Sequence, residues 1–262
     1  MSYANPQAYE RFMGRWSARL APAFLRFVGL EHAHRVLDVG SGTGTLARAA
    51  IAAGLAAEVV GIDPVPEYVA FAREAVPPGR AEFHVGDGAS LAFSDGSFDA
   101  ALSLLVLQEF ADPRPAVLEM ARVTRAGGVV ATCMWDFNDG LPMLSLFWRA
   151  AEAVAPEDVR RKMRGNEPQR HATPSDLQGL WRRCGVADIR TATLEVAMEF
   201  SSFTDYWEPF LGGSTPTSAF AAALERQTGG AMTQVMRQQI AGMQVDGSFV
   251  LPARAWAVKG TV

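Results

Sequence analysis

The sequence contains little cysteine and no excess of basic charge. Only Cys133 and Cys184 occur among its 262 residues, and they show no metal-ligand spacing. We therefore expect no metal site and a reducing, cytoplasmic location. Acidic and basic residues nearly balance at a net charge of -4, which provides no electrostatic footprint for phosphate backbones. We expect no nucleic-acid partner.

Long apolar runs are also missing. The first sixteen residues, MSYANPQAYERFMGRW, lack the apolar core of a signal peptide. No stretch approaches the uninterrupted apolar length that a membrane-spanning helix needs. We therefore expect no membrane span. A chain of 262 residues can bury a full core, and we expect one domain.

The most informative stretch runs from Arg35 to Gly44, with the sequence RVLDVGSGTG. Its apolar residues predict a buried parallel strand. The glycines that follow let the backbone turn sharply and approach a ligand; they are Gly40, Gly42 and Gly44. The alanine-rich residues 45–54 then predict a helix. Strand, glycine loop and helix together indicate a nucleotide site.

Spacing and charge narrow the choice of nucleotide. A dinucleotide fingerprint requires G-x-G-x-x-G, but here Thr45 stands where the third glycine belongs. A phosphate-binding P-loop would end in Gly-Lys-Ser/Thr, and this loop contains no lysine. Asp38, directly before the loop, would repel a pyrophosphate by roughly 4 kcal/mol at about 4 Å. The same carboxylate attracts the cationic amine and sulfonium of S-adenosylmethionine (SAM), although a strand-end Asp that caps the next helix is the alternative.

Two further strands are predicted to end in acids. Asp63 closes the strand EVVGID about 20 residues after the glycine loop, where a doubly wound fold places a ribose-binding carboxylate. Pro64 follows it and belongs to the same candidate site. Asp87 ends the third strand and is a candidate to bind the adenine amino group, with Gly88 and Ala89 leaving space for the ring. Asp63 as an ordinary helix cap is the alternative.

A fourth strand leads into the run SLLVLQEF, from Ser103 to Phe110. We expect this run to cross under the ligand, with the carbonyls of Ser103 and Leu104 near the methionyl amine. Gln108 would lie at the mouth of the site.

Before the glycine loop, aromatic and apolar residues recur every three or four positions from Pro6 to Val28, which predicts one or two helices packed on the sheet. Tyr9, Arg15 and Trp16 are candidates to close over a ligand. Arg15 is included because a free carboxylate needs a cationic partner.

Four successive segments then resemble the motifs of class I SAM-dependent methyltransferases, in the subgroup of ubiquinone and menaquinone biosynthesis. They are VLDVGSGTG, VVGIDP, VGDGASLAFSDGSFDAALS and EMARVTRAGGVVA, within 35–135. The resemblance implies an α/β, Rossmann-like, doubly wound sheet of seven strands with an antiparallel last strand and helical lid insertions. Ser41 stands where many relatives carry cysteine; both are small, and Ser41 remains a candidate SAM contact.

The resemblance divides the chain into N-terminal helices (1–34), a SAM-binding core (35–136) and a variable half (137–262) that holds the acceptor site. In this half, a basic run from Arg160 to Arg164 is interpreted as a solvated helix face or as an attraction for an anionic acceptor. His171 is a candidate general base. Residues 203–210 form an aromatic stripe that is either core or a lid.

The candidate acceptor-pocket residues are Tyr9, Trp16, Trp135 and Trp207. Weak catalytic candidates are His171, Tyr9 and Gln108, and none is a clear base. We expect a SAM-dependent methyltransferase acting on a small molecule, with S-adenosylhomocysteine as product. Alternatives are a non-catalytic SAM-binding protein and an NAD(P)-dependent oxidoreductase. The sequence leaves the acceptor and the oligomeric state open.

Overall fold

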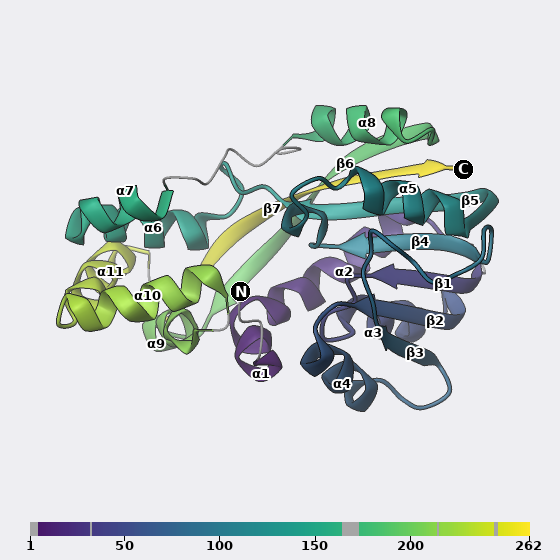
Figure 1. The fold of residues 1–262 in the computed structure, drawn as a ribbon. Helices are drawn as coiled ribbons and strands as arrows, with labels where there is room; N and C mark the ends of the chain where they lie inside the picture. The colour runs from purple at the N-terminus through teal and green to yellow at the C-terminus, as the bar shows by residue number, and fades with distance from the viewer. Residues whose placement is uncertain (1–4, 32, 164–172, 214, 244–245) are drawn as a thin grey trace.

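The computed structural model describes residues 5–31, 33–163, 173–213, 215–243 and 246–262. Within them the strands form one seven-stranded sheet in the order β3-β2-β1-β4-β5-β7-β6 (Figure 1). The strands are β1 (Ala33–Val39), β2 (Ala56–Asp63), β3 (Ala81–Val85), β4 (Phe98–Leu104), β5 (Thr124–Trp135), β6 (Ala187–Phe200) and β7 (Phe249–Thr261). β1 to β5 run parallel, and β7 is antiparallel to both its neighbours. The predicted fold, including the antiparallel last strand, is confirmed.

Helices connect the strands and extend the chain beyond the sheet. The N-terminal elements are α1 (Pro6–Tyr9), the π-helical turn η1 (Glu10–Gly14) and α2 (Arg15–Val28). The core helices are α3 (Thr45–Ala52), α4 (Pro66–Ala75), η2 (Leu107–Glu109) and α5 (Arg114–Val123). The variable half contains α6 (Pro142–Val154), α7 (Pro156–Met163), α8 (Pro174–Arg183), α9 (Phe203–Trp207), η3 (Glu208–Gly212), α10 (Pro216–Gln227) and α11 (Ala231–Ala241).

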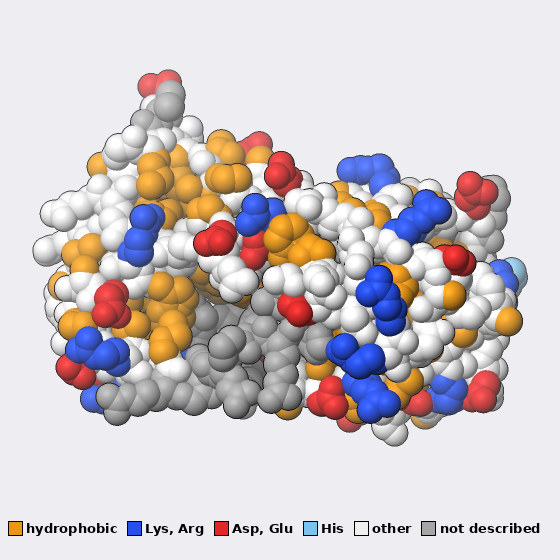
Figure 2. Space-filling model, turned by 90° about the horizontal axis from the view of Figure 1, so that it is seen from above, with side chains coloured by type: hydrophobic (Ala, Val, Ile, Leu, Met, Phe, Trp, Pro, Cys, Tyr) orange, Lys and Arg blue, Asp and Glu red, His pale blue; other side chains and the backbone are white. Residues whose placement is uncertain are grey.

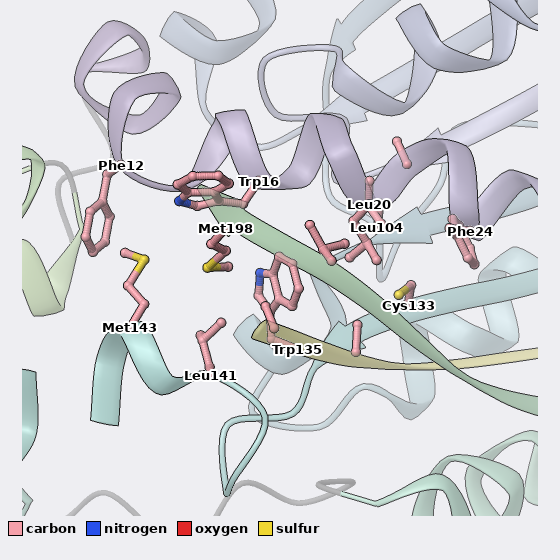
Figure 3. Close-up of a cluster of buried hydrophobic side chains, with 14 of the residues drawn as sticks. Phe12, Trp16, Leu20, Phe24, Leu104, Cys133, Trp135, Leu141, Met143 and Met198 are labelled. Carbon is pink, nitrogen blue, oxygen red and sulfur yellow. The ribbon is translucent and has the colours of Figure 1, made fainter. Parts of the chain in front are cut away.

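Both faces of the sheet are buried, as a parallel sheet requires. Successive residues of β1 face opposite sides: Val36 packs in the cluster with α2, α3 and α4, whereas Leu37 packs with α5 and α8. The first cluster is the larger and continues into the variable half. Figure 3 shows the side of α2 that carries Trp16, Leu20 and Phe24 turned toward the sheet. The N-terminal stripe predicted from its spacing is therefore largely core.

Five helices of the variable half, α6, α7, α9, α10 and α11, lie together at the end of the molecule away from the parallel strands (Figure 1). The aromatic stripe of residues 203–210 packs inside this group. The ring of Phe210 stacks on that of Phe147 at 5.3 Å and on that of Trp207 at 5.6 Å. The stripe is thus core of the insertion, one of its two predicted interpretations.

One boundary and one helix differ from the sequence pattern. A glycine pair such as Gly127 and Gly128 is typical of a break between a helix and a strand, but α5 already ends at Val123 and β5 begins at Thr124. The Thr124 hydroxyl donates to the carbonyl of Met120, which satisfies a carbonyl at the helix end. Helix α11 was not predicted, although its buried residues Met232, Met236 and Ile240 recur at every fourth position.

No helix in the described part of the chain is long and apolar enough to cross a membrane. On the face drawn in Figure 2, basic and acidic side chains lie among one another, and hydrophobic side chains gather mostly over the end that holds the helices of the variable half.

A buried carboxylate joins the end of β5 to β7. Asp136 is 3% exposed and accepts from Nε of Arg254 at 2.8 Å. Backbone bonds reinforce the pair, since Asp136 N donates to the Arg254 carbonyl. The pair fixes the start of the variable half against the sheet.

We predict that Arg254→Met lowers the free energy of unfolding by about 2 to 3 kcal/mol, because it leaves a buried carboxylate without its cationic partner, while the arginine side chain is already 37% exposed. Arg19→Met is the matched control, since the Arg19–Glu199 pair is 45% and 60% exposed and should contribute little to stability. Urea denaturation followed by fluorescence measures both. Equal losses in the two variants would contradict the assignment.

Candidate functional site

The glycine loop folds over the end of β2. The backbone N–H groups of Gly40 and Ser41 both donate to the Ile62 carbonyl, at 2.7 and 2.9 Å. Gly40 has a φ of +73°, and a Cβ built on it would lie 2.4 Å from Val106 Cγ1. Val106 follows β4, so the loop after β1 and the loop after β4 touch at this position. Only glycine fits between them.

Asp38 lies at the end of β1 and is 1% exposed. Its Oδ2 has no hydrogen-bond partner among the described residues. Burial, together with the nearby charge of Asp63, raises the pKa of Asp38 to about 7, and the backbone N–H of Ala47 in α3 lowers it. The helix-capping alternative is thus partly realised through Ala47, but one oxygen is left without a partner. Such an atom favours a ligand that brings a donor or a positive charge.

Asp63 lies at the end of β2, beside Asp38. Its Oδ2 accepts from Gly42 N and its Oδ1 from Val65 N, both at 2.9 Å. Burial raises its pKa, and these two backbone bonds lower it. Asp63 therefore holds the glycine loop in place and also lines the cavity described below. A carboxylate has further lone pairs, so it can still accept from a ligand.

Asp87 follows the neighbouring strand β3 and completes the row of acids. Its Oδ1 accepts from Ala89 N at 2.9 Å, and its side chain is exposed at the cavity. Gly88 packs against Val39, where a Cβ would lie 2.7 Å from Val39 Cγ1. Since β3, β2 and β1 are adjacent, the structure brings the three predicted acids to one edge of the sheet.

The segment after β4 runs beneath this edge. Leu105 has a positive φ of 63°, which is strained for a leucine and typical of a functional site. The Gln108 side chain donates to the Leu105 carbonyl, and its Oε1 is buried without a partner among the described residues. Ser103 is fully buried, and its hydroxyl is likewise unpartnered there, as is that of Ser41 in the glycine loop.

A cavity of about 740 Å³ opens from the acid edge toward the variable half, a volume typical of small-molecule sites. Residues near the strand ends line one side: Gly40, Asp63, Pro64, Val65, Tyr68, Asp87, Gly88, Leu105, Val106, Gln108, Glu109 and Phe110. The N-terminal helix and the variable half line the other: Tyr9, Phe12, Met13, Trp135, Phe137, Leu144, Trp148, Lys162, Thr215, Pro216 and Thr217.

Several predicted site residues do not line this cavity. Trp16 is 1% exposed and packs edge-on against Phe200. Trp207 is buried, and its Nε1 donates to the Thr233 hydroxyl. Both tryptophans therefore pack in the core of this structure, and the guanidinium groups of Arg15 and Arg19 also lie over the ring of Trp16.

Arg15 is paired within the protein. Its Nη1 bonds Asp205 Oδ1 at 2.6 Å and its Nη2 donates to the Asp205 carbonyl. These bonds tie α2 to α9 and turn the guanidinium away from the cavity, so the structure does not present Arg15 to a ligand carboxylate. The remaining predicted donor-site residues do not line the cavity, although they belong to the strand ends and loops whose other residues do: Asp38, Ser41, Gly42, Gly44, Ala89, Ser103 and Leu104.

None of the described acid–base candidates is a ready base. Burial, with the charges of Glu10, Glu109 and Asp63, raises the pKa of Tyr9 to about 12, and the Ser17 hydroxyl lowers it. The phenol of Tyr9 therefore stays protonated near neutral pH. Gln108 does not titrate. His171 lies outside the described residues.

Comparison with known proteins agrees with this geometry. Residues 37–132 match the methyltransferase domain family. Residues 37–132 therefore carry a methyltransferase domain, and the predicted resemblance to SAM-dependent methyltransferases is confirmed. An uncharacterized methyltransferase of Mycobacterium tuberculosis is 37% identical over 134 residues, which cover 50% of each chain. A demethylmenaquinone methyltransferase of Parafrankia sp. is 36% identical over 155 residues, covering 51% of this chain and 60% of the relative.

The matched segment thus spans about half the length of these curated relatives. Among solved structures, the fold resembles a Haemonchus contortus phosphoethanolamine N-methyltransferase 2 crystallised with SAM. The TM-score is 0.60 and the identity 18%, over 99% of this chain and 57% of that one. At this identity the likeness concerns the fold. The methyltransferase domain accounts for the strand ends and leaves the variable half unassigned.

Sequence reasoning missed most of the far cavity wall. Phe12 and Met13 belong to the N-terminal stripe, which was predicted to pack on the sheet, and Leu144 and Trp148 of α6 were not among the candidate site residues. Lys162 was part of the basic run, with no sign of which basic residue faces inward. A helical periodicity shows that a residue is on an apolar face, but it does not distinguish a packed core from a cavity wall.

We predict that Gly40→Ala lowers the free energy of unfolding by about 2 to 4 kcal/mol, since it adds overpacking against Val106 to the positive φ. Gly54→Ala is the control: its φ is +66°, but a Cβ there meets nothing within 4 Å. The control should lose only about 1 kcal/mol. Chemical denaturation separates the two, and equal losses would contradict the contact with Val106.

A second prediction concerns pH. The raised pKa of Asp38 means that between pH about 4 and 7 the folded protein holds a proton that the unfolded chain has released. Asp38 therefore makes the ligand-free protein less stable as pH rises through this window, by up to roughly 4 kcal/mol. In Asp38→Asn this contribution should vanish, so that the variant gains stability relative to the wild type from pH 4 to 7. A pH-independent difference in denaturation midpoints would refute it.

Proposed function

We propose that this chain is a SAM-dependent methyltransferase that acts on a small-molecule acceptor. The observation that carries the proposal is the row of carboxyls from Asp38, Asp63 and Asp87 at adjacent strand ends, with one oxygen of Asp38 buried and unpartnered within the described residues. A cationic ligand compensates this buried charge, whereas a pyrophosphate would add to it. The methyltransferase domain over 37–132 supports the same conclusion.

The residues that are present fit SAM. Asp63 would accept from the ribose hydroxyls, and Asp87 from the adenine amine, with Pro64, Gly88 and Ala89 around the ring. Asp38, Ser41 and Ser103 offer buried polar atoms without partners in the described chain to the methionyl end. When bound, SAM supplies an electrophilic methyl group on a sulfonium.

The chain's own contribution is orientation and exclusion of water. Leu105 and Val106 hold the floor of the cavity beneath the strand ends, and Gln108 presents an unpartnered amide oxygen. Aromatic and apolar side chains from α6 and the N-terminal helix line the far wall. Such a wall favours catalysis by positioning rather than by proton transfer. The phenol of Tyr9 stays protonated at the cavity wall and does not act as a base.

Two other functions share part of these features. A nicotinamide-dependent oxidoreductase has the same type of fold and an acid in the place of Asp63, but the carboxylate of Asp38 would repel the pyrophosphate of the nicotinamide cofactor. A non-catalytic SAM-binding protein would keep the donor site and lack turnover. The cavity continues well past the strand ends into the variable half, which favours an enzyme with room for a second substrate.

Calorimetric titration with SAM, S-adenosylhomocysteine and NAD(H), followed by a donor-consumption assay over phenols, quinols, amines and carboxylic acids, tests the proposal. Binding of the first two ligands together with formation of S-adenosylhomocysteine is the expected result. Binding of NAD(H) alone would reject it, and tight SAM binding without turnover of any acceptor would favour the non-catalytic alternative.

We predict that Asp63→Ala weakens SAM binding by about 1.5 to 3 kcal/mol, through loss of charged hydrogen bonds. Asp63→Asn keeps an acceptor for the Gly42 N–H and should lose less. Glu74→Ala, an exposed residue of α4 outside the cavity lining, is the control and should bind normally. An unchanged dissociation constant in Asp63→Ala would exclude the ribose assignment.

A further inference from the structure

We infer that the acceptor is an apolar ring compound that carries an anionic group, and that Lys162 recognises this group. The inference rests on the proposed function and names the chemical class of its acceptor. It comes from how the residues of α7 are divided between the solvent and the cavity.

The basic run in α7 is split by its contacts. Arg160 bonds Glu157 at 2.6 Å and Arg161 bonds Asp158 at 3.0 Å, one turn earlier on the same helix. Both are i,i+3 pairs, and both arginines are solvent-exposed, although Asp158 itself is partly buried. Lys162, the next residue, is half-buried and lines the cavity instead. The sequence allows two interpretations of this run. Arg160 and Arg161 fit the solvated helix face, and Lys162 is the residue placed to attract an anionic acceptor.

Lysine is rare in this chain. Of 24 basic residues only Lys162 and Lys259 are lysines. The ammonium of Lys259 donates to the Val28 carbonyl and so has a structural partner. Among the described residues, no carboxylate pairs with Lys162. Its Nζ lies 6.0 Å from the centre of the Phe220 ring. Its charge is thus available to a ligand.

The surroundings of Lys162 explain why the acceptor body should be apolar. The same side of the cavity is formed by the rings of Phe12, Trp135, Phe137 and Trp148 with Leu144 and Met13. Flat aromatic walls bind ring compounds by stacking and apolar burial. A single cation among such side chains gives a strong and directional preference for one anionic substituent.

The other charges of the cavity lie elsewhere. Asp63, Asp87 and Glu109 are all on the side of the strand ends, where the cationic methyl donor is proposed to bind. The cavity is therefore negative at its donor end and positive at α7. An anionic acceptor would be repelled from the first end and held at the second, which orients it in the cavity.

The carboxylate of SAM is a second possible source of the anion, because Arg15 is paired with Asp205 and does not offer itself. The two sources predict different outcomes. If Lys162 binds the acceptor, its removal changes acceptor binding and leaves the affinity for S-adenosylhomocysteine unaltered. If it binds the donor carboxylate, the affinity for S-adenosylhomocysteine falls.

Two fluorescent probes with the same ring system provide the test. 1-Anilinonaphthalene-8-sulfonate carries an anion, and N-phenyl-1-naphthylamine is its neutral counterpart. Both are titrated into protein saturated with S-adenosylhomocysteine, so that the donor end is filled. We expect Lys162→Met to weaken the sulfonate probe about tenfold, as loss of a charged hydrogen bond implies, and to leave the neutral probe unchanged.

Two further variants act as controls. Lys162→Arg restores a cation and should retain the preference for the sulfonate. Arg161→Met removes an exposed charge from the same helix and should bind both probes like the wild type. Equal weakening of both probes by Lys162→Met, or no change in either, would overturn the inference. So would a loss of affinity for S-adenosylhomocysteine alone, which assigns Lys162 to the donor.

Chemical labelling locates the probe independently. With only two lysines in the chain, acetylation by acetic anhydride and peptide mass mapping report each one separately. The sulfonate probe should slow the acetylation of Lys162 and leave Lys259 unaffected, whereas equal rates with and without the probe would contradict binding at α7. If the protein fails to bind SAM at all, the proposed function fails, and these probe measurements on the ligand-free protein still decide the anion preference.

Discussion

The structure depends on the cost of burying carboxyl groups at one edge of a parallel sheet. Asp38 is almost completely covered, and Asp63 is covered while it holds the glycine loop through Gly42. Burial and the charge of Asp63 raise the pKa of Asp38, so the edge is not at its most stable when no cation is bound there. A positively charged ligand relieves that repulsion. The buried carboxyl groups therefore lower the stability of the ligand-free protein and raise its affinity for a cationic ligand at this edge.

The core half of the chain was predictable from sequence because its signals are local. A strand, a glycine loop and an acid at a fixed spacing specify both a fold and a place on it, and β2 and α4 end where the pattern indicates. For Asp63 the sequence predicted only one of two features. Its position at the cavity followed from the spacing, but its hydrogen bond from Gly42 N depends on how two loops meet in space.

The N-terminal helices and the variable half were less predictable for the opposite reason. Tryptophans such as Trp16 and Trp207 are typical of the wall of a ligand pocket. Both are buried instead, because they contact residues that are distant in the sequence, Phe200 and Thr233 respectively. Arg15 was predicted to pair with a ligand carboxylate, but in the structure it pairs with Asp205, which lies far away in the sequence. Conversely, Lys162 was hidden in a run of ordinary surface charges. Long-range pairing decides these roles, and no short pattern encodes it.

The way the insertion leaves and rejoins the sheet has a consequence for how this protein can diversify. Phe200 and Phe249 are paired across β6 and β7, and their rings stack at 5.0 Å. The helices between β6 and β7 therefore begin and end at neighbouring positions, which the stacked rings of Phe200 and Phe249 hold together. Such a segment can be lengthened, shortened or replaced in evolution without displacing the strands beside it. New substrates can be accommodated while the methyl-donor end is inherited unchanged.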